Sequence, residues 1–118
     1  MTSTKTYLTD IMQSIKRIED YTKGGRTIFD MDTKTQDAVA RNFEIIGEVV
    51  KRLPPEMLTQ YPDVPWRAVA GFRDVLIHDY ATVDLDEVWL TIERDLPPLK
   101  TAIQTMLDKI NSEDDEGQ

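Results

Sequence analysis

Apolar side chains recur at intervals of three and four positions along most of the chain, which is the spacing of one face of an α-helix. Long stripes of this kind cover residues 8–18, 39–53 and 85–110, and a shorter stripe covers residues 69–76. No stretch shows the alternation of a half-buried strand, and no Asn-Gly or Asp-Gly pair indicates a hairpin. The pattern therefore predicts an all-α fold whose core is formed by these stripes.

Glycine and proline pairs predict where the helices end. Gly24-Gly25 follows the first stripe, where glycine commonly terminates a helix. Pro54-Pro55 ends the second stripe, and a short turn of helix is expected at residues 56–60. Pro97-Pro98 interrupts the last stripe, so we expect a kink or break near residue 96.

Cap residues predict where the helices begin. Thr33 with Gln36, and Asp84 with Glu87, match the capping-box pattern. Pro65 suits the first turn of a further helix. The expected architecture is an antiparallel helical bundle of four main helices plus a short helix.

Size and charge complete this description. A chain of 118 residues is one domain by size, and we expect a helical domain at 1–111 and an acidic, disordered tail at 112–118. The net charge is -8, but residues 41–80 carry 5 basic and 6 acidic groups and are almost neutral. The acidity argues against a general nucleic-acid-binding surface, because phosphate binding is driven by basic groups. A local site remains compatible with it.

Several classes of protein are excluded or disfavoured by composition. The chain has no cysteine, so disulfides, zinc–thiolate sites and cysteine nucleophiles are excluded. A single histidine makes a dedicated transition-metal site improbable. No apolar run approaches the length of a membrane span, and the N-terminus lacks the layout of a signal peptide. We expect a cytoplasmic protein that uses no metal or cofactor.

The candidate chemistry lies in residues 73–80, on the predicted third main helix. His78 is the only histidine, and histidine can exchange protons near neutral pH. Arg73 is a permanent cation that can stabilise a phosphoryl transition state. Asp74 lies one helical turn before His78 on the same face and can orient the imidazole ring. These residues supply what a metal-free ribonuclease needs.

The spacing also leaves another interpretation open. On a helix, Arg73 and His78 are about 140° apart around the axis and about 7.5 Å apart along it, so they share no face. His78 could simply favour a helix C-terminus, with Arg73 paired to Asp74 or Asp79. One histidine does not readily serve as both the acid and the base of the reaction. A two-fold dimer would supply a second Arg73–His78 pair.

Other residues favour such a dimer. Gly71 permits close approach of a symmetry-related helix. Trp66, Phe72 and Trp89 are additional apolar side chains, which indicates more buried surface than a monomer needs. We therefore expect a homodimer.

Four segments together strongly resemble the HepT family of HEPN-domain toxins: 42–48 (NFEIIGE), 64–67 (VPWR), 71–80 (GFRDVLIHDY) and 95–100 (DLPPLK). The resemblance covers roughly residues 7–110. It implies a dimeric all-α bundle with paired motifs in an interface cleft, and a metal-independent ribonuclease that arrests growth in prokaryotes. Arg73 and His78 match the family's catalytic pair, and Asp74 matches its supporting polar position, which is often asparagine.

The resemblance also implies regulation by a partner. Family members are paired with a minimal nucleotidyltransferase antitoxin, MntA, which transfers AMP from ATP onto the motif tyrosine. Tyr80 matches that tyrosine, although a buried or capping role is the structural alternative. The implied substrate is RNA, with tRNA among the targets.

Two other functions stay open at the level of sequence. The acidic balance favours a non-catalytic helical subunit that binds a nucleotidyltransferase. A nucleotide-binding enzyme of another kind is disfavoured, because the chain has no glycine-rich phosphate loop.

Overall fold

The computed structural model describes residues 3–79 and 82–116, and within these ranges the chain forms helices and no strand. This confirms the predicted all-α class. The helices are more numerous than the predicted four and a short one: α1 (Thr4–Thr22), α2 (Arg26–Met31), α3 (Thr33–Val50), α4 (Pro55–Leu58), α5 (Trp66–Asp79), α6 (Leu85–Arg94) and α7 (Leu96–Glu116).

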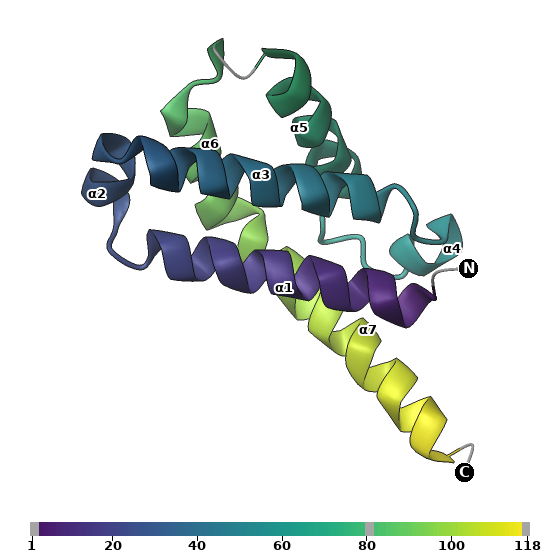
Figure 1. Ribbon diagram of the computed structural model, residues 1–118. Coiled ribbons are helices and arrows are strands. Elements are labelled where there is room, and N and C mark those ends of the chain that lie inside the picture. The colour runs from purple at the N-terminus through teal and green to yellow at the C-terminus, as the bar shows by residue number, and fades with distance from the viewer. Residues whose placement is uncertain (1–2, 80–81, 117–118) are drawn as a thin grey trace.

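Helix α3 is the centre of the arrangement. It lies between α1 and α5 and packs against both, whereas α7 crosses α1 and extends away from the body (Figure 1). The helices α1, α3, α5, α6 and α7 bury the apolar stripes that the sequence pattern predicts. The largest fully buried apolar side chains come from α1, α2, α3, α5 and α7: Leu8, Ile11, Ile15, Ile18, Phe29, Val39, Ile46, Leu76, Leu99 and Ile103.

The start of α3 differs from the prediction by one residue. Asp32, not Thr33, is the N-cap, and its carboxylate accepts hydrogen bonds from the Lys34 amide at 3.1 Å and the Thr35 hydroxyl at 2.7 Å. Gln36 donates its side-chain amide to the carbonyl oxygens of the preceding helix α2. The predicted Thr33–Gln36 capping box is therefore wrong, because both side chains of an Asp-Thr pair can cap and the aspartate takes the position.

The break before α7 is confirmed. Helix α6 is capped by Asp84, as predicted, and ends at Arg94, and Asp95 forms the turn. Pro97 and Pro98 follow in the first turn of α7, where their missing N–H groups cost nothing. Helix α7 then continues past residue 111, the predicted end of the helical domain, so residues 112–116 are helical. Residues 99–116 contain no glycine or proline that would stop the helix.

The aromatic residues that we expected at a dimer interface pack within the chain. The Trp66 indole donates to the carbonyl oxygens of Leu58 and Tyr61. Phe72 meets Phe43 edge-on with ring centroids 5.4 Å apart, and Trp89 packs on the Phe29 ring at the same distance. These aromatic side chains therefore do not support the dimer prediction.

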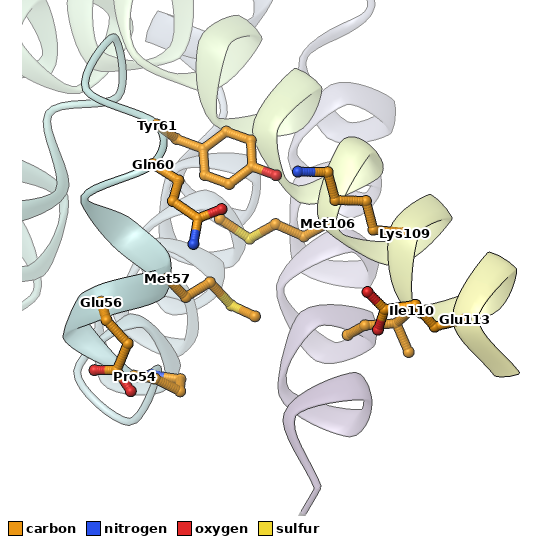
Figure 2. A pocket seen from close by; sticks show the side chains of 9 residues that line it. All are labelled: Pro54, Glu56, Met57, Gln60, Tyr61, Met106, Lys109, Ile110 and Glu113. Atoms are coloured by element: carbon orange, nitrogen blue, oxygen red, sulfur yellow. The ribbon is translucent and has the colours of Figure 1, made fainter. Parts of the chain in front are cut away.

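A surface groove separates α4 from α7. Met57 and Met106 line it, and Lys109 places its ammonium 5.8 Å from the centre of the Tyr61 ring (Figure 2). It lies away from residues 73–78. Within the described residues, no helix has the length and apolar character that crossing a bilayer requires.

Candidate functional site

Helix α5 carries the predicted catalytic residues, and its packing decides which of them are accessible. Val69 and Leu76 are buried against the core, and Phe72 packs beside them. Arg73 follows on the same edge and lies against Gly47 of α3. The base of the arginine side chain is therefore held at the α3–α5 contact.

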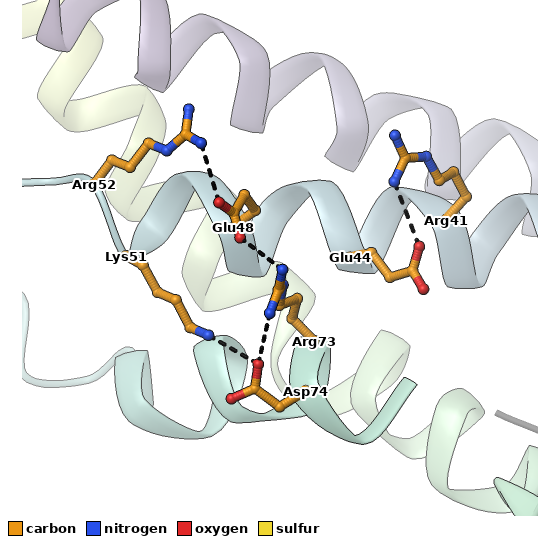
Figure 3. A network of polar contacts seen from close by, with 7 residues as sticks. All are labelled: Arg41, Glu44, Glu48, Lys51, Arg52, Arg73 and Asp74. Carbon is orange, nitrogen blue, oxygen red and sulfur yellow. Dashed lines mark hydrogen bonds and ion pairs between the residues drawn. The ribbon is translucent and has the colours of Figure 1, made fainter. Parts of the chain in front are cut away.

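Two carboxylates hold the Arg73 guanidinium. One nitrogen, Nη1, donates to Asp74 Oδ1 at 2.9 Å, and the other, Nη2, lies 3.0 Å from Glu48 Oε2 of α3 (Figure 3). These contacts raise the pKa of Arg73, chiefly through the hydrogen bond to Asp74 and also through the charges of Glu48 and Glu44. The Arg73–Asp74 ion pair, which the other interpretation of the spacing expected, is thus present. It leaves 28% of the arginine side chain exposed.

Asp74 is shared between two cations. Lys51, the C-cap of α3, places its ammonium 2.9 Å from the same Oδ1 atom that Arg73 contacts. The hydrogen bonds from Lys51 and then Arg73 hold the pKa of Asp74 below its usual value. In this structure the carboxylate is engaged by the cations, and its role as an acceptor for His78 stays a prediction.

His78 lies one turn further along α5 and is exposed. Among the described residues, no side chain is a hydrogen-bond or ion-pair partner of its imidazole ring. Arg73 and His78 come from the same helix but not from the same face, as the helical geometry predicts. The fourth predicted site residue, Tyr80, lies outside the described residues.

An apolar surface lies beside the site on α5 and α6. Val75 of α5 is 42% exposed and Leu90 of α6 is 49% exposed. A groove lined by Gly71, Val75 and Leu90 separates the two helices. The position of a Gly71 Cβ atom meets nothing within 4 Å, so the backbone there is open to another molecule. Val75 and Leu90, with the partly buried Phe72 between the same helices, form the unpartnered apolar face.

In the part of the chain that the structure describes, no three histidine or carboxylate side chains gather as a ligand set. The described part of the site presents an arginine held by two carboxylates and an exposed histidine.

Sequence reasoning did not single out three residues that shape this site. Glu48, Lys51 and Gly47 all come from α3 and meet α5 only in the folded chain. The one signal that could have found them is the resemblance of residues 42–48 (NFEIIGE), which contain both Gly47 and Glu48. Lys51 lies just beyond that segment.

The fold and site define a small all-α protein in which one helix carries an exposed histidine and a carboxylate-held arginine. Residues 11–106 match the family described as HepT-like, "Ribonuclease HepT-like". The chain belongs to this family. The matched segment contains α3 and α5 in full, and with them the whole candidate site.

Curated relatives agree with this assignment. "Probable ribonuclease HepT" of Thermococcus cleftensis is 44% identical over 101 residues, which is 83% of this chain and 90% of that protein. A "Putative RNase" of Methanocaldococcus jannaschii is 37% identical, with 94% of this chain and 93% of that protein covered.

One relative is longer than this chain. "Gamma-glutamylcyclotransferase and putative RNase" of M. jannaschii is 42% identical over 91% of this chain, which corresponds to 49% of its own length. This chain therefore spans about half of that relative. No solved structure matches the chain.

Proposed function

We propose that the protein is the toxin of a toxin–antitoxin system and acts as a metal-independent endoribonuclease. Membership of the HepT-like family supports the ribonuclease activity, since relatives across most of the chain are named as probable or putative ribonucleases. The toxin role and the metal independence rest on the resemblance of residues 71–80 to the family motif. The substrate is RNA, with tRNA as one target. Arg73 and His78 are the proposed catalytic residues.

The proposed reaction is transesterification within RNA. A base removes the proton of a 2′-hydroxyl, whose oxygen attacks the adjacent phosphorus, and an acid protonates the leaving 5′-oxygen. The exposed imidazole of His78 is suited to proton transfer. Arg73, held by Glu48 and Asp74, is suited to stabilise the non-bridging oxygens, because an oriented cation needs little reorganisation during the reaction.

A homodimer completes the proposed site. One chain offers one histidine, whereas the reaction uses both an acid and a base. Val75 and Leu90 form the apolar face that we propose as the dimer contact, with Gly71 of the same groove allowing close approach. Pairing through this face of α5 would bring two Arg73–His78 pairs near one groove.

We propose that a cognate MntA-like nucleotidyltransferase silences the toxin by adding AMP to Tyr80. The added phosphate would compete with RNA for Arg73, because a guanidinium pairs strongly with phosphate oxygens. The nucleotide would also obstruct the groove. The support for this step is the resemblance of residues 71–80 to the family motif.

Cleavage of purified total RNA in EDTA tests the activity. We expect fragments with the wild type, and none with His78→Ala or with wild type pre-incubated with the nucleotidyltransferase and ATP. Intact mass should show the added AMP, and Tyr80→Phe should prevent its addition. Equal cleavage by folded Arg73→Ala, His78→Ala and wild type would refute the site assignment.

A non-catalytic binding subunit is the second candidate function. The net charge of -8 favours it, because the chain as a whole repels RNA. In that case the protein would bind the nucleotidyltransferase tightly. Folded and unmodified wild type would leave RNA intact at every concentration.

A further inference from the structure

Five charged side chains form one continuous row across the α3–α5 contact: Arg52, Glu48, Arg73, Asp74 and Lys51 (Figure 3). Cations and carboxylates alternate along it, with a cation at each end. Three positive charges therefore face two negative charges, so the row carries one net positive charge on a chain whose total is -8. RNA-binding groups should be sought at such a local excess.

Lys51 is the end of the row that contacts helix α5 directly. It contacts Asp74, and Asp74 and His78 are one helical turn apart, about 6 Å along the axis of α5. The Lys51 side chain is 39% exposed. Its ammonium has three donors, of which the described residues engage one.

The geometry already holds two cations on a single anionic oxygen. Arg73 Nη1 and Lys51 Nζ each lie 2.9 Å from Asp74 Oδ1, although they come from different helices. A phosphate oxygen is an acceptor of the same kind, and both cations keep further donors for it. Because Gly47 brings α3 close to α5, the two cations are positioned before any ligand arrives.

We propose that Lys51 binds a phosphate of the RNA substrate alongside Arg73, which extends the proposed ribonuclease site from α5 onto the end of α3. This inference rests on the proposed function. Lys51 is a binding residue here: it contributes to affinity, and proton transfer stays with His78.

Binding of labelled total tRNA tests this role. The measurement uses His78→Ala protein, so that the RNA stays intact, and compares it with the same protein carrying Lys51→Gln across a series of salt concentrations. We expect about tenfold weaker binding at low salt. The slope of log affinity against log salt should fall by about 0.7–0.9, the value for one lost phosphate contact. Lys51→Arg should restore both.

Lys34→Gln is the matched control. Lys34 lies on the same helix, also exposed, near the opposite end of α3, and the substitution removes the same charge. It should leave affinity and salt slope nearly unchanged. An equal loss in both variants would show a general charge effect and overturn the proposal.

A second comparison separates phosphate contact from a purely structural role. Lys51 also holds Asp74, so its loss could act through that carboxylate. In an Asp74→Asn background, residue 74 has no carboxylate for Lys51 to hold. If Lys51→Gln still weakens tRNA binding there, the lysine contacts RNA. If its effect disappears, Lys51 is only a support for Asp74 and the proposal is wrong.

Cleavage by otherwise wild-type protein separates this proposal from the proposed function. If wild type cleaves RNA and Lys51→Gln leaves affinity and salt slope unchanged, only the Lys51 contact is refuted. Wild type that binds tRNA through Lys51 but never cleaves it refutes the ribonuclease activity alone. Wild type that does not bind tRNA refutes both.

Discussion

Gly47 of α3 lies so close to Arg73 of α5 that a Cβ atom at Gly47 would be 2.4 Å from the Arg73 Cβ. The same Cβ would lie 3.2 Å from the Val69 carbonyl oxygen. The missing side chain thus sets the distance between the two helices. It also sets the place from which the arginine reaches Glu48 and Asp74.

Gly47→Ala should consequently destabilise the fold and displace Arg73 together. The added methyl group would meet the Arg73 Cβ and the Val69 carbonyl oxygen, which cannot move away unless the two helices separate. We therefore expect a loss of about 1–3 kcal/mol in unfolding free energy. Urea denaturation measures it. RNA cleavage under conditions where the variant stays folded should also fall. A variant as stable and active as wild type would show that the helices separate at little cost.

The apolar face of α5 should control dimerisation. Val75→Glu places a charge on this face, where Val75 is 42% exposed, and should give a folded monomer in sedimentation velocity. RNA cleavage should fall with the dimer. Tyr21→Glu is the control, because Tyr21 is similarly exposed at 40% but lies on α1, which is separated from α5 by α3 (Figure 1). Dimers that survive Val75→Glu would place the interface elsewhere.

Glu48→Gln should separate positioning from binding. The variant keeps a polar side chain beside Arg73 but loses the charge that orients it and bridges it to Arg52. We expect the single-turnover cleavage rate to drop roughly tenfold because the arginine is less well placed. Affinity for RNA should hold or rise, since a negative charge leaves the site. A loss confined to affinity would contradict a positioning role.

The Asp32 cap should make stability depend on acid pH. The hydrogen bond from Thr35, followed by the amides of the first turn, lowers the pKa of Asp32 below 3.8. A carboxyl with a depressed pKa stabilises the fold above its ordinary pKa, and this contribution disappears as pH falls through the lower, folded value. Thermal unfolding should therefore show Asp32→Ala less stable than wild type at pH 7, with the difference shrinking below pH 4.

Asp32→Asn is the matched variant for this effect. Asparagine can also cap a helix, but it does not titrate. The stability of Asp32→Asn should stay near that of wild type at pH 7. It should not show the loss of stability at acid pH that protonation of Asp32 causes in wild type. A difference between Asp32→Ala and wild type that is constant down to pH 2 would exclude the titration of this carboxyl as the cause.

Much of the fold could be predicted because each long helix buries a regular apolar stripe. Helix α2 was missed because six residues are too few for a three–four pattern to repeat. The one-residue error at Asp32 arose where two neighbouring residues both suit an N-cap. The ring contacts of Phe72 and Trp89 within the chain could not be predicted, because a sequence shows that these residues are apolar but not that Phe43 and Phe29 contact them.

The candidate site was predictable only along α5. The residue types and spacing of Arg73 and His78 indicate their chemistry, and their helical offset is local geometry. The partners Glu48 and Lys51 lie on another helix, so no spacing within α5 reveals them. Tertiary packing, set by Gly47, decides which carboxylates meet the arginine.

The contact between α1 and α7 has a consequence for the order of folding. Glu19 and Lys100 form an ion pair across 81 positions of sequence, whereas α1, α3 and α5 pack on near neighbours along the chain. Closing the longer loop costs more entropy, so we expect α7 to dock after the other helices have assembled. During synthesis, the apolar face of α1 that α7 covers would thus stay open until α7 has left the ribosome.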